Sequence, residues 1–460
     1  AQAQRPCPQP PALGPPEGWC AWVRAMAPEA IDVSCSKDAA DPKDIDISCS
    51  QDADPQEDID VSGSQGADPP ATCHRAGPMK RNKVMVRVPA TSANLGPGFD
   101  AIGMAVDIWN EITVERAEKF SVSASGEGEK LIPCEVGPNG ESKHLVLRAL
   151  RRAFEHAGEV PMPPVRIFTR NMVPVCSGFG SSSSAIVGGL IAGLVLAGKE
   201  LKVREDRPGC GSSFDIAQGL DPEELLHLAT DIEGHPDNVA PAIYGGIQLS
   251  VQTDPDLDVG VPAAVMSRRI PHPASMRLVA YVPSEKARLG HGLDKTEEMR
   301  GMLKPMIPRK DAVANIQRTA LLIDSLHRGD FNSLRFATRD KLHQPIRGEK
   351  AFPHFDPVIQ AAIKAGAHGA FLSGAGPTVM AICSGQAGEV FTQRSSERQE
   401  GDVALAMQKA LDALPEKVQE TWGNGKFYIV SPTSRGAHVV LADPPYSDSF
   451  AHFGSLDGPI

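Results

Sequence analysis

The chain has 460 residues, of which 41% are hydrophobic and 22% are charged, and this balance excludes a wholly disordered or fibrous protein. Its formal net charge of −11 makes nucleic acid or an anionic membrane surface an unfavourable main partner. The longest apolar run, Ala185 to Ala197, is too short to cross a bilayer. These figures indicate a globular protein with neither nucleic acid nor membrane as its partner.

Cysteine usage indicates a reducing compartment. Five of the nine cysteines precede residue 80, and the other four are far apart with no paired spacing. A disulfide scaffold or a structural zinc site is therefore not expected. The N-terminal segment is acidic, whereas organelle transit peptides are rich in arginine and poor in acids. We therefore expect a cytoplasmic protein.

Residues 1–80 differ in composition from the rest of the chain. They carry 13 acidic and 6 basic side chains. From Ile31 a similar unit begins every fourteen residues, as IDVSCSKDAADPKD, IDISCSQDADPQED and IDVSGSQGADPP. Each unit holds too little apolar surface to offset its ordering entropy. We expect a disordered acidic segment, which is either an interaction tail, an appendage without function, or translated sequence upstream of a start at Met79.

From Lys83 the sequence alternates between strand and helix patterns. Residues 84–88 and 101–114 are predicted strands, and residues 144–156 have the apolar spacing of a helix. Residues 165–169 are a third predicted strand. Residues 181–197 predict a helix that is apolar nearly all round and therefore buried. Asp221 is the expected N-cap of a further helix, residues 222–231.

A second set of elements begins near residue 276. Residues 276–282 predict a strand, and residues 311–326 a long amphipathic helix. Residues 370–372 and 379–382 predict two strands joined by SGAGPT. The mixture indicates an α+β or α/β fold. The polar stretches 202–217 and 386–401 are expected to be surface insertions, and a domain boundary is expected within residues 253–275.

The glycine-rich loop at residues 174–184 (PVCSGFGSSSS) leads directly into the predicted buried helix. Gly178 and Gly180 would let the backbone approach a ligand closely. The four serines that follow place N–H groups and hydroxyls at a helix N-terminus, which favours a phosphate group. A serine-capped tight turn before a core helix is the alternative interpretation.

Two more segments carry polar groups suited to chemistry. Residues 233–238 (EGHPDN) place two carboxylates, an imidazole and an amide side by side. Mg²⁺ prefers carboxylate and hydroxyl oxygen, so Glu233 with a serine of the glycine-rich loop would suit it. A polar turn between helices is the alternative. Arg300 and Arg347 could each grip a carboxylate bidentately, although a lone arginine often has only a solvated surface role.

Five strings together resemble the GHMP kinase superfamily and, within it, the homoserine kinase family: PATSANLGPGFDAIG, SGFGSSSSA, EGHPDN, RDKLHQPIR and LSGAGPTVMAI. The resemblance covers roughly residues 83–445. It implies an α+β fold in which an N-terminal mixed α/β domain, which binds ATP, precedes a C-terminal ferredoxin-like domain. The expected domains are therefore residues 81–260 and 261–445, followed by a tail at residues 446–460.

The resemblance implies that ATP and L-homoserine react to give ADP and O-phospho-L-homoserine, a step toward threonine. It implies ATP and Mg²⁺ as cofactors, with Ser182 and Glu233 holding the metal. The implied ATP-binding residues are Pro174, Ser177, Gly178, Phe179, Gly180, Ser181, Ser182, Ser183 and Ser184. The implied substrate-binding residues are Asn94, Asp100, His235, Asn238, Arg300, Arg347 and Gly374.

The resemblance implies that Asp100 pairs with the substrate ammonium and that Arg300 and Arg347 pair with the substrate carboxylate. Arg300 lies in the segment that matches the family least closely. For catalysis we expect Asn238 to orient the hydroxyl without a strong base, with Glu233 as metal ligand and Asp237 as the competing base. The family also implies a homodimer. The alternatives are another GHMP kinase, such as a mevalonate kinase, or an inactive binding protein of the same fold.

Overall fold

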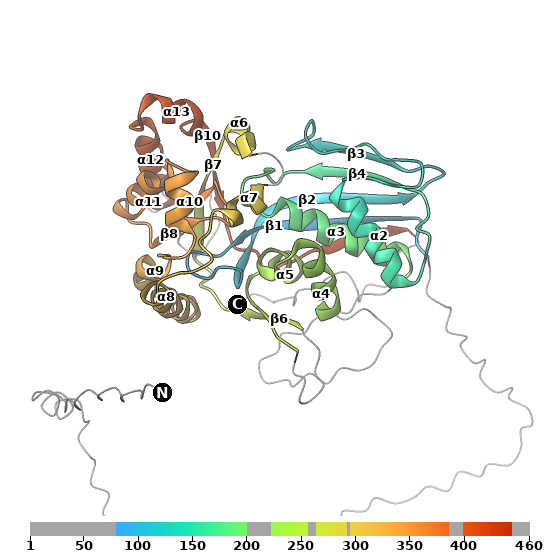
Figure 1. Ribbon diagram of the computed structural model, residues 1–460, viewed down its shortest axis with the longest axis horizontal. Coiled ribbons are helices and arrows are strands. Elements are labelled where there is room, and N and C mark those ends of the chain that lie inside the picture. The colour runs from blue at the N-terminus through green and yellow to red at the C-terminus, as the bar shows by residue number, and fades with distance from the viewer. Residues whose placement is uncertain (1–79, 200–221, 256–263, 292–294, 386–398, 444–460) are drawn as a thin grey trace, which may run out of the picture. The chain divides into compact units, whose positions relative to one another are not determined.

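The computed structural model describes residues 80–199, 222–255, 264–291, 295–385 and 399–443 (Figure 1). The expected acidic segment, apart from Lys80, lies outside these residues, as do the stretch 202–217, the N-cap Asp221 and the tail 446–460. No helix among the described residues combines the length and hydrophobicity that a membrane crossing requires.

The larger sheet contains seven strands of the described residues, with a central order β11-β1-β2-β4-β3 and with β5 joining β2 to β6. Its strands are antiparallel except for the parallel pair β3 and β4. The bounds are β1 Lys83–Ala93, β2 Ile102–Arg116, β3 Ser121–Gly126, β4 Val165–Asn171, β5 Ile247–Gln252, β6 Val265–Ile270 and β11 His438–Asp443. The predicted strands at 84–88, 101–114 and 165–169 are confirmed as the cores of β1, β2 and β4.

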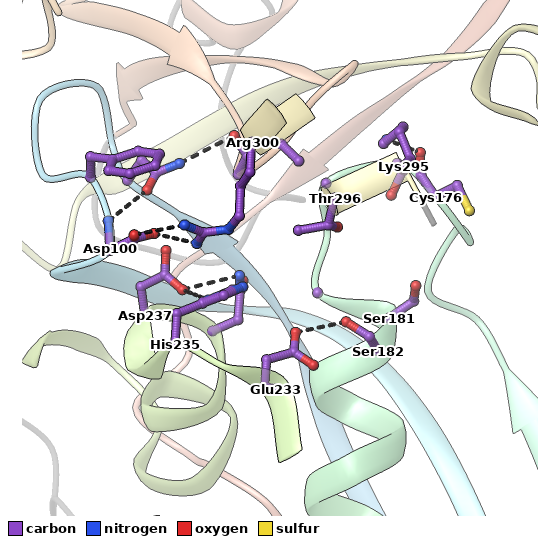
Figure 2. A pocket seen from close by; sticks show the side chains of 18 of the residues that line it. Asp100, Cys176, Ser181, Ser182, Glu233, His235, Asp237, Lys295, Thr296 and Arg300 are labelled. Carbon is purple, nitrogen blue, oxygen red and sulfur yellow. Dashed lines mark hydrogen bonds and ion pairs between the residues drawn. The ribbon is translucent and has the colours of Figure 1, made fainter. Parts of the chain in front are cut away.

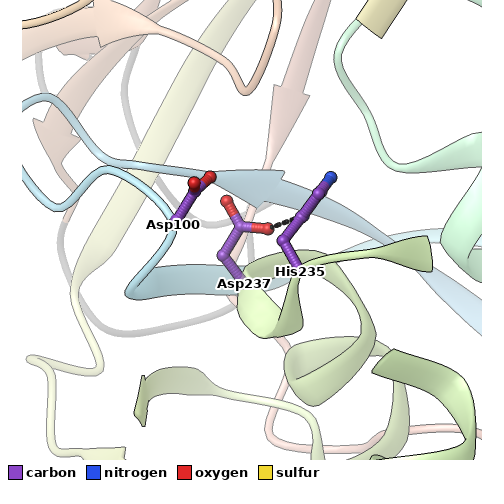
Figure 3. A group of neighbouring side chains, drawn as sticks. All are labelled: Asp100, His235 and Asp237. Atoms are coloured by element: carbon purple, nitrogen blue, oxygen red, sulfur yellow. Dashed lines mark hydrogen bonds and ion pairs between the residues drawn. The ribbon is translucent and has the colours of Figure 1, made fainter. Parts of the chain in front are cut away.

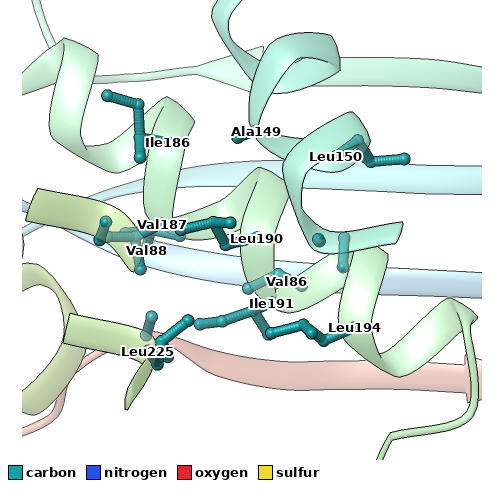
Figure 4. Packing of buried hydrophobic residues seen from close by; sticks show 14 of the residues in the cluster. Val86, Val88, Ala149, Leu150, Ile186, Val187, Leu190, Ile191, Leu194 and Leu225 are labelled. Carbon is teal, nitrogen blue, oxygen red and sulfur yellow. The ribbon is translucent and has the colours of Figure 1, made fainter. Parts of the chain in front are cut away.

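Four helices pack against one face of this sheet (Figure 1). They are α2 Leu145–Ala157, α3 Ser181–Leu196, α4 Pro222–Glu233 and α5 Pro236–Tyr244. Figure 4 shows Val187, Leu190 and Ile191 of α3 close to Val86 and Val88 of β1, with α2 beside α3, and all five side chains belong to one buried cluster. Thirteen residues of α3 are buried, which confirms the predicted buried helix. This packing holds the first turn of α3 at one end of the sheet.

The smaller sheet has the order β10-β7-β9-β8 and is antiparallel throughout. Its strands are β7 Met276–Pro283, β8 Gly369–Leu372, β9 Val379–Ser384 and β10 Gly425–Val430. If β7, β8, β9 and β10 are numbered one to four in chain order, they lie side by side in the order 4-1-3-2. Helices connect the first strand to the second and the third strand to the fourth. That is the split βαβ order of a ferredoxin-like fold, as expected.

The helices of this second half are mostly short. The bounds are α6 Glu285–Arg288, η1 Leu289–His291, α7 Lys295–Gly301, α8 Arg309–Arg328, α9 Phe331–Ala337, α10 Gln344–Lys350, α11 Phe355–Lys364, α12 Gln399–Asp412 and α13 Glu416–Trp422. The predicted helix 311–326 is confirmed within α8. Its residues Leu322 and Leu326 are buried in a hydrophobic cluster that contains residues of both sheets.

Strand β6 was not predicted. It lies within the stretch 253–275 and pairs with β5 in the larger sheet, while the domain boundary expected within this stretch stays a prediction. The stretch 386–401 is not a loop throughout, because residues 399–401 begin α12. Strand β11 also returns from the end of the chain to pair with β1. The domain limits 81–260 and 261–445 stay a prediction, although strands on both sides of residue 260 join the larger sheet.

Candidate active site

Three loops distant in sequence meet at the end of the larger sheet. The first, residues 89–100, comprises the end of β1 and the turn that leads to β2. The second, residues 174–184, ends in the first turn of α3, and the third, residues 373–378, links β8 to β9. Backbone hydrogen bonds join them: Gly374 N–H donates to Ala93, and Thr378 N–H to Ser177, each at 3.1 Å. Because these bonds fix the loops to one another, their side chains line one pocket (Figure 2).

Gly178 is the closest point of contact between the second and third loops. Its φ is +96°, and a Cβ atom there would lie 2.2 Å from the carbonyl oxygen of Ser373. No other residue type fits this position without moving one of the loops. Packing between the second and third loops therefore accounts for the close backbone approach predicted at this glycine, with or without a bound ligand.

The second loop ends at the N-terminus of α3. Helix α3 begins at Ser181 after Gly180, which adopts a left-handed conformation. The hydroxyls of Ser182 and Ser183 both donate to one carboxylate oxygen of Glu233, each at 2.7 Å. Burial raises the pKa of Glu233, although His235 and the two hydroxyls oppose this shift. Carboxylate and hydroxyl oxygens at a helix N-terminus are a donor set that suits Mg²⁺ and phosphate.

The start of α5 and the residue before it supply three polar residues to the same pocket. Pro236 opens this helix at the first helical position, which proline favours, and Asp237 follows it. A short hydrogen bond joins Asp237 to Nδ1 of His235. Burial would lower the pKa of His235, but this bond and the charges of Asp237 and Glu233 raise it overall. Asn238 Oδ1 accepts from the Thr91 hydroxyl at 2.8 Å, so strand β1 fixes its orientation.

Asp100 and Arg300 form a bidentate ion pair across the pocket. The two guanidinium nitrogens of Arg300 lie 2.9 and 2.5 Å from the two oxygens of Asp100 (Figure 2). Asn94 supports this corner, because its side-chain oxygen accepts from the backbone N–H of Asp100 at 3.1 Å. The predicted acid and one predicted arginine thus face the same point in space, although 200 residues separate them.

Arg347 lies beside this pair but is far more buried, with 2% of its surface exposed. One guanidinium nitrogen donates at 3.1 Å both to Nδ1 of His343 and to the carbonyl oxygen of Gly374. Burial, helped by Arg300, lowers the pKa of Arg347 to about 10. Phe99 contacts both arginines, with its ring centre 5.3 Å from the Cζ of Arg300 and 5.6 Å from that of Arg347. The loop Phe99–Asp100 therefore holds both cations.

Asp100, His235 and Asp237 form another group that could bind a cation. Each offers a ligand atom within 4.8 Å of the others (Figure 3). Asp100 is already paired with Arg300, however, and Asp237 with His235. The group is therefore better suited to bind an organic cation in place of the Arg300 guanidinium than to hold a metal ion.

Most of the predicted site residues line the pocket. Those that do are Asn94, Asp100, Ser177, Gly178, Gly180, Ser181, Ser182, Glu233, His235, Asp237, Asn238, Arg300, Arg347 and Gly374. Four predicted ATP-binding residues do not line it: Pro174, Phe179, Ser183 and Ser184. Phe179 is fully buried near Tyr428, and the hydroxyl of Ser184 accepts from Asn110 at 2.7 Å. These two side chains therefore serve the core beneath the loop.

Sequence reasoning missed five lining residues: Phe99, Cys176, Lys295, Thr296 and Ala375. A signal for Lys295 was present, because Lys295 and Met299 are four residues apart and thus on the same face of α7. Both are buried. A lysine on the buried face of a helix is unusual unless it has partners.

A larger cavity of about 720 Å³ adjoins this pocket on the other side of the second loop. Cys176, Ser181 and Ser182 line both spaces. Most of the remaining wall comes from β2, β4, the segment after β4, α2 and the segment before α2, including the apolar side chains Ile112, Ile132 and Val173. The site therefore has a polar chamber and a more apolar chamber that meet at the N-terminus of α3.

Comparisons with known proteins assign the family. The profile of the GHMP kinase N-terminal domain matches residues 144–207, and that of the GHMP kinase C-terminal domain matches residues 322–413. A homoserine kinase of Desulfitobacterium hafniense is 36% identical over 357 residues, which are 78% of this chain and all of that protein. The chain belongs to the homoserine kinase family of the GHMP kinases.

A second relative agrees with this assignment, and a solved structure shares the fold. The homoserine kinase of Moorella thermoacetica is 36% identical over 302 residues, which are 66% of this chain and 88% of that protein. The crystal structure of a homoserine kinase from Cytophaga hutchinsonii aligns with a TM-score of 0.57 and 24% identity, over 78% of this chain and 98% of that one. The expected α+β fold of the GHMP kinases is confirmed.

Proposed function

We propose that this chain transfers the terminal phosphoryl group of ATP to the hydroxyl of L-homoserine, giving ADP and O-phospho-L-homoserine. The observation that carries the proposal is the make-up of one pocket. One end holds an acid and two guanidinium groups, and the other holds the N-terminus of α3 with Ser182 and Glu233. The names of the homoserine kinases that it resembles support the same reaction.

The acid and the arginines form a frame for a zwitterion. In the Asp100–Arg300 pair each charge already has an opposite partner. An amino acid can replace this pairing without leaving a charge unmatched, because its ammonium can take Asp100 while its carboxylate takes Arg300 and Arg347. Arginine suits this role since its planar fork matches a carboxylate. A substrate without an ammonium group, such as mevalonate, would leave Asp100 without a cation.

The opposite end is suited to the triphosphate and its metal. Ser182 and Glu233 would hold Mg²⁺, because together they offer hydroxyl and carboxylate oxygen at one point. When bound, the metal would neutralise charge on the terminal phosphates. The N–H groups at the start of α3 would receive phosphate oxygens. The adjoining larger cavity would take the nucleoside, which is consistent with its more apolar wall.

Asn238 would orient the hydroxyl that attacks the phosphate. Its side chain is held at both ends, by Thr91 at 2.8 Å and by Asp237 at 3.4 Å. Phosphoryl transfer depends mainly on positioning and charge neutralisation, so no strong base is required. Asp237 is the competing base. If Asp237→Asn reduced kcat far more than Asn238→Ala, with unchanged substrate affinity, the scheme without a base would be abandoned.

We also propose that the protein acts as a homodimer in the cytoplasm. The resemblance to the homoserine kinase family supports self-association. Analytical ultracentrifugation of the purified chain should give twice the mass of one chain at micromolar concentration. A single species with the mass of one chain would remove this part of the proposal.

The proposed reaction is tested by ADP release from the purified full chain with MgATP. The acceptors are L-homoserine, L-serine, L-threonine, mevalonate and none. We expect rapid turnover with homoserine and little with the others. Turnover with mevalonate instead would reject the zwitterion frame. Binding of ATP without turnover on any acceptor would favour an inactive binding protein of the same fold.

A further inference from the structure

Lys295 is a buried lysine that the proposed chemistry does not yet use. It is the first residue of α7, and 3% of its surface is exposed. Its ammonium donates to two backbone carbonyl oxygens, those of Cys176 and Gly376. One carbonyl belongs to the second loop and the other to the third, so Lys295 lies where the two loops meet.

The charge of Lys295 is poorly compensated by these partners. No carboxylate of the described residues forms an ion pair with it, and carbonyl dipoles offset a buried charge only in part. Burial lowers its pKa to about 7. Of the charged or titratable groups around it, Cys176 and Glu298 favour the ammonium, whereas Arg288 and Arg347 oppose it. The surroundings therefore favour an added anion.

The position of Lys295 indicates which anion would fit. It lines the pocket together with Cys176, Thr296, Ser181 and Ser182, next to the start of α3 (Figure 2). The two arginines of the pocket serve its other end, because Arg300 pairs with Asp100 and Arg347 donates to His343. Among the described lining residues, Lys295 is thus the cation at the end proposed for the phosphates.

We propose that Lys295 binds a phosphate oxygen of the nucleotide directly. An ammonium has three N–H groups, and the two carbonyl contacts use two of them, which leaves one to donate to the ligand. The carbonyl contacts would at the same time hold the ammonium in place. This role rests on the proposed function, since it requires ATP in the adjoining chamber.

The decisive test compares ligands that differ only in phosphate. Binding of ATP, ADP and adenosine to the full chain is measured by calorimetry for the unaltered protein and for Lys295→Met, which keeps length but removes charge. We expect ATP and ADP to bind about 10- to 100-fold more weakly, the effect of losing a charged hydrogen bond. Adenosine should bind with less than about a twofold change, because it has no phosphate to lose. Lys286→Met, an exposed lysine on α6, is the matched control and should change nothing.

The outcomes separate this role from a purely structural one. If adenosine and ATP lost affinity equally, Lys295 would only hold the loops together, and the proposal would be wrong. Unchanged ATP binding in Lys295→Met would also reject it. If the unaltered chain bound no ATP, the proposed function would fail and this role with it. If only the role of Lys295 were wrong, the unaltered chain would still bind ATP and phosphorylate homoserine.

A second measurement needs no variant that could misfold. A lysine that gains an anionic partner takes up a proton when the ligand binds. ATP binding to the unaltered chain, measured near pH 8 with a chelator and in two buffers of different ionisation enthalpy, should show net proton uptake. Binding without proton uptake would contradict the proposal.

Discussion

At the residue scale, the carboxylate of Glu233 combines a structural role with a proposed role in catalysis. Its carboxylate accepts from two serine hydroxyls of α3 and is the proposed metal ligand. Glu233→Gln keeps an acceptor for these hydroxyls but removes the charge. We expect kcat to fall at least about 1,000-fold, because the site depends on charge neutralisation. The rate is followed over a wide range of Mg²⁺ concentrations, and Glu224→Gln, on an exposed face of the same helix, is the control. Near-normal turnover would place the metal elsewhere.

Arg347 offers a second test at the scale of one residue. Arg347→Lys keeps a positive charge but cannot form the fork that grips both oxygens of a carboxylate. We expect the KM for homoserine to rise about 10- to 100-fold while the KM for ATP stays within about twofold. Steady-state kinetics with each substrate varied measures this, and the exposed Arg335→Lys serves as control. An unchanged homoserine KM would reject a role in carboxylate binding.

At the scale of elements, the approach of α5 to β2 decides where Asp237 and Asn238 lie. Gly103 of β2 faces the first turn of α5 so closely that a Cβ atom would lie 1.6 Å from the carbonyl oxygen of Asp237. The glycine is therefore required for close packing and not for an unusual φ angle.

Gly103→Ala should push α5 away from the sheet and displace both polar side chains. We expect kcat to fall by more than about tenfold and the melting temperature to fall by several degrees, as for an overpacked core. Gly301→Ala, with open space around the added methyl, is the matched control. Unchanged activity and melting temperature in Gly103→Ala would show that α5 can move without affecting the site.

At the scale of the whole molecule, buried histidines link stability to pH. His144, His343 and His354 lie in different parts of the structure, and burial lowers the pKa of each to about 4 from 6.5. Between these values the unfolded chain takes up protons that the folded chain cannot. These three histidines therefore leave stability unchanged above about pH 6.5 and lower it as pH decreases toward 4. Each histidine lowers the free energy of unfolding by up to about 3 kcal/mol as the pH falls from about 6.5 to about 4.

Urea unfolding at several pH values between 7.5 and 4.5 measures this loss. His354→Phe should be less stable at neutral pH, since it loses a hydrogen bond to Pro377, but its stability should depend less steeply on pH. His327→Gln alters an exposed histidine and should keep the original slope. An equally steep slope in His354→Phe would remove His354 from the explanation.

Sequence reasoning predicted the local elements well and the long-range pairings poorly. The pattern of apolar residues placed β1, β2, β4 and α2 because burial on one face repeats with the period of the element, and it placed α3 as a continuous apolar run that is buried nearly all round. Nothing local indicates that residues 438–443 return to pair with β1 or that residues 265–270 extend the larger sheet. Such pairings depend on which strand edges remain available once the rest of the chain has folded.

The sequence by itself determined the family, the order of its loops and most of the charged groups of the site, because these depend on residue types at short spacing. The tertiary structure decided which charges meet. It joined Asp100 to Arg300 and placed Lys295 between two loops. The reason is physical: Coulomb interactions and desolvation depend on distance and burial in space, which short stretches of sequence do not specify.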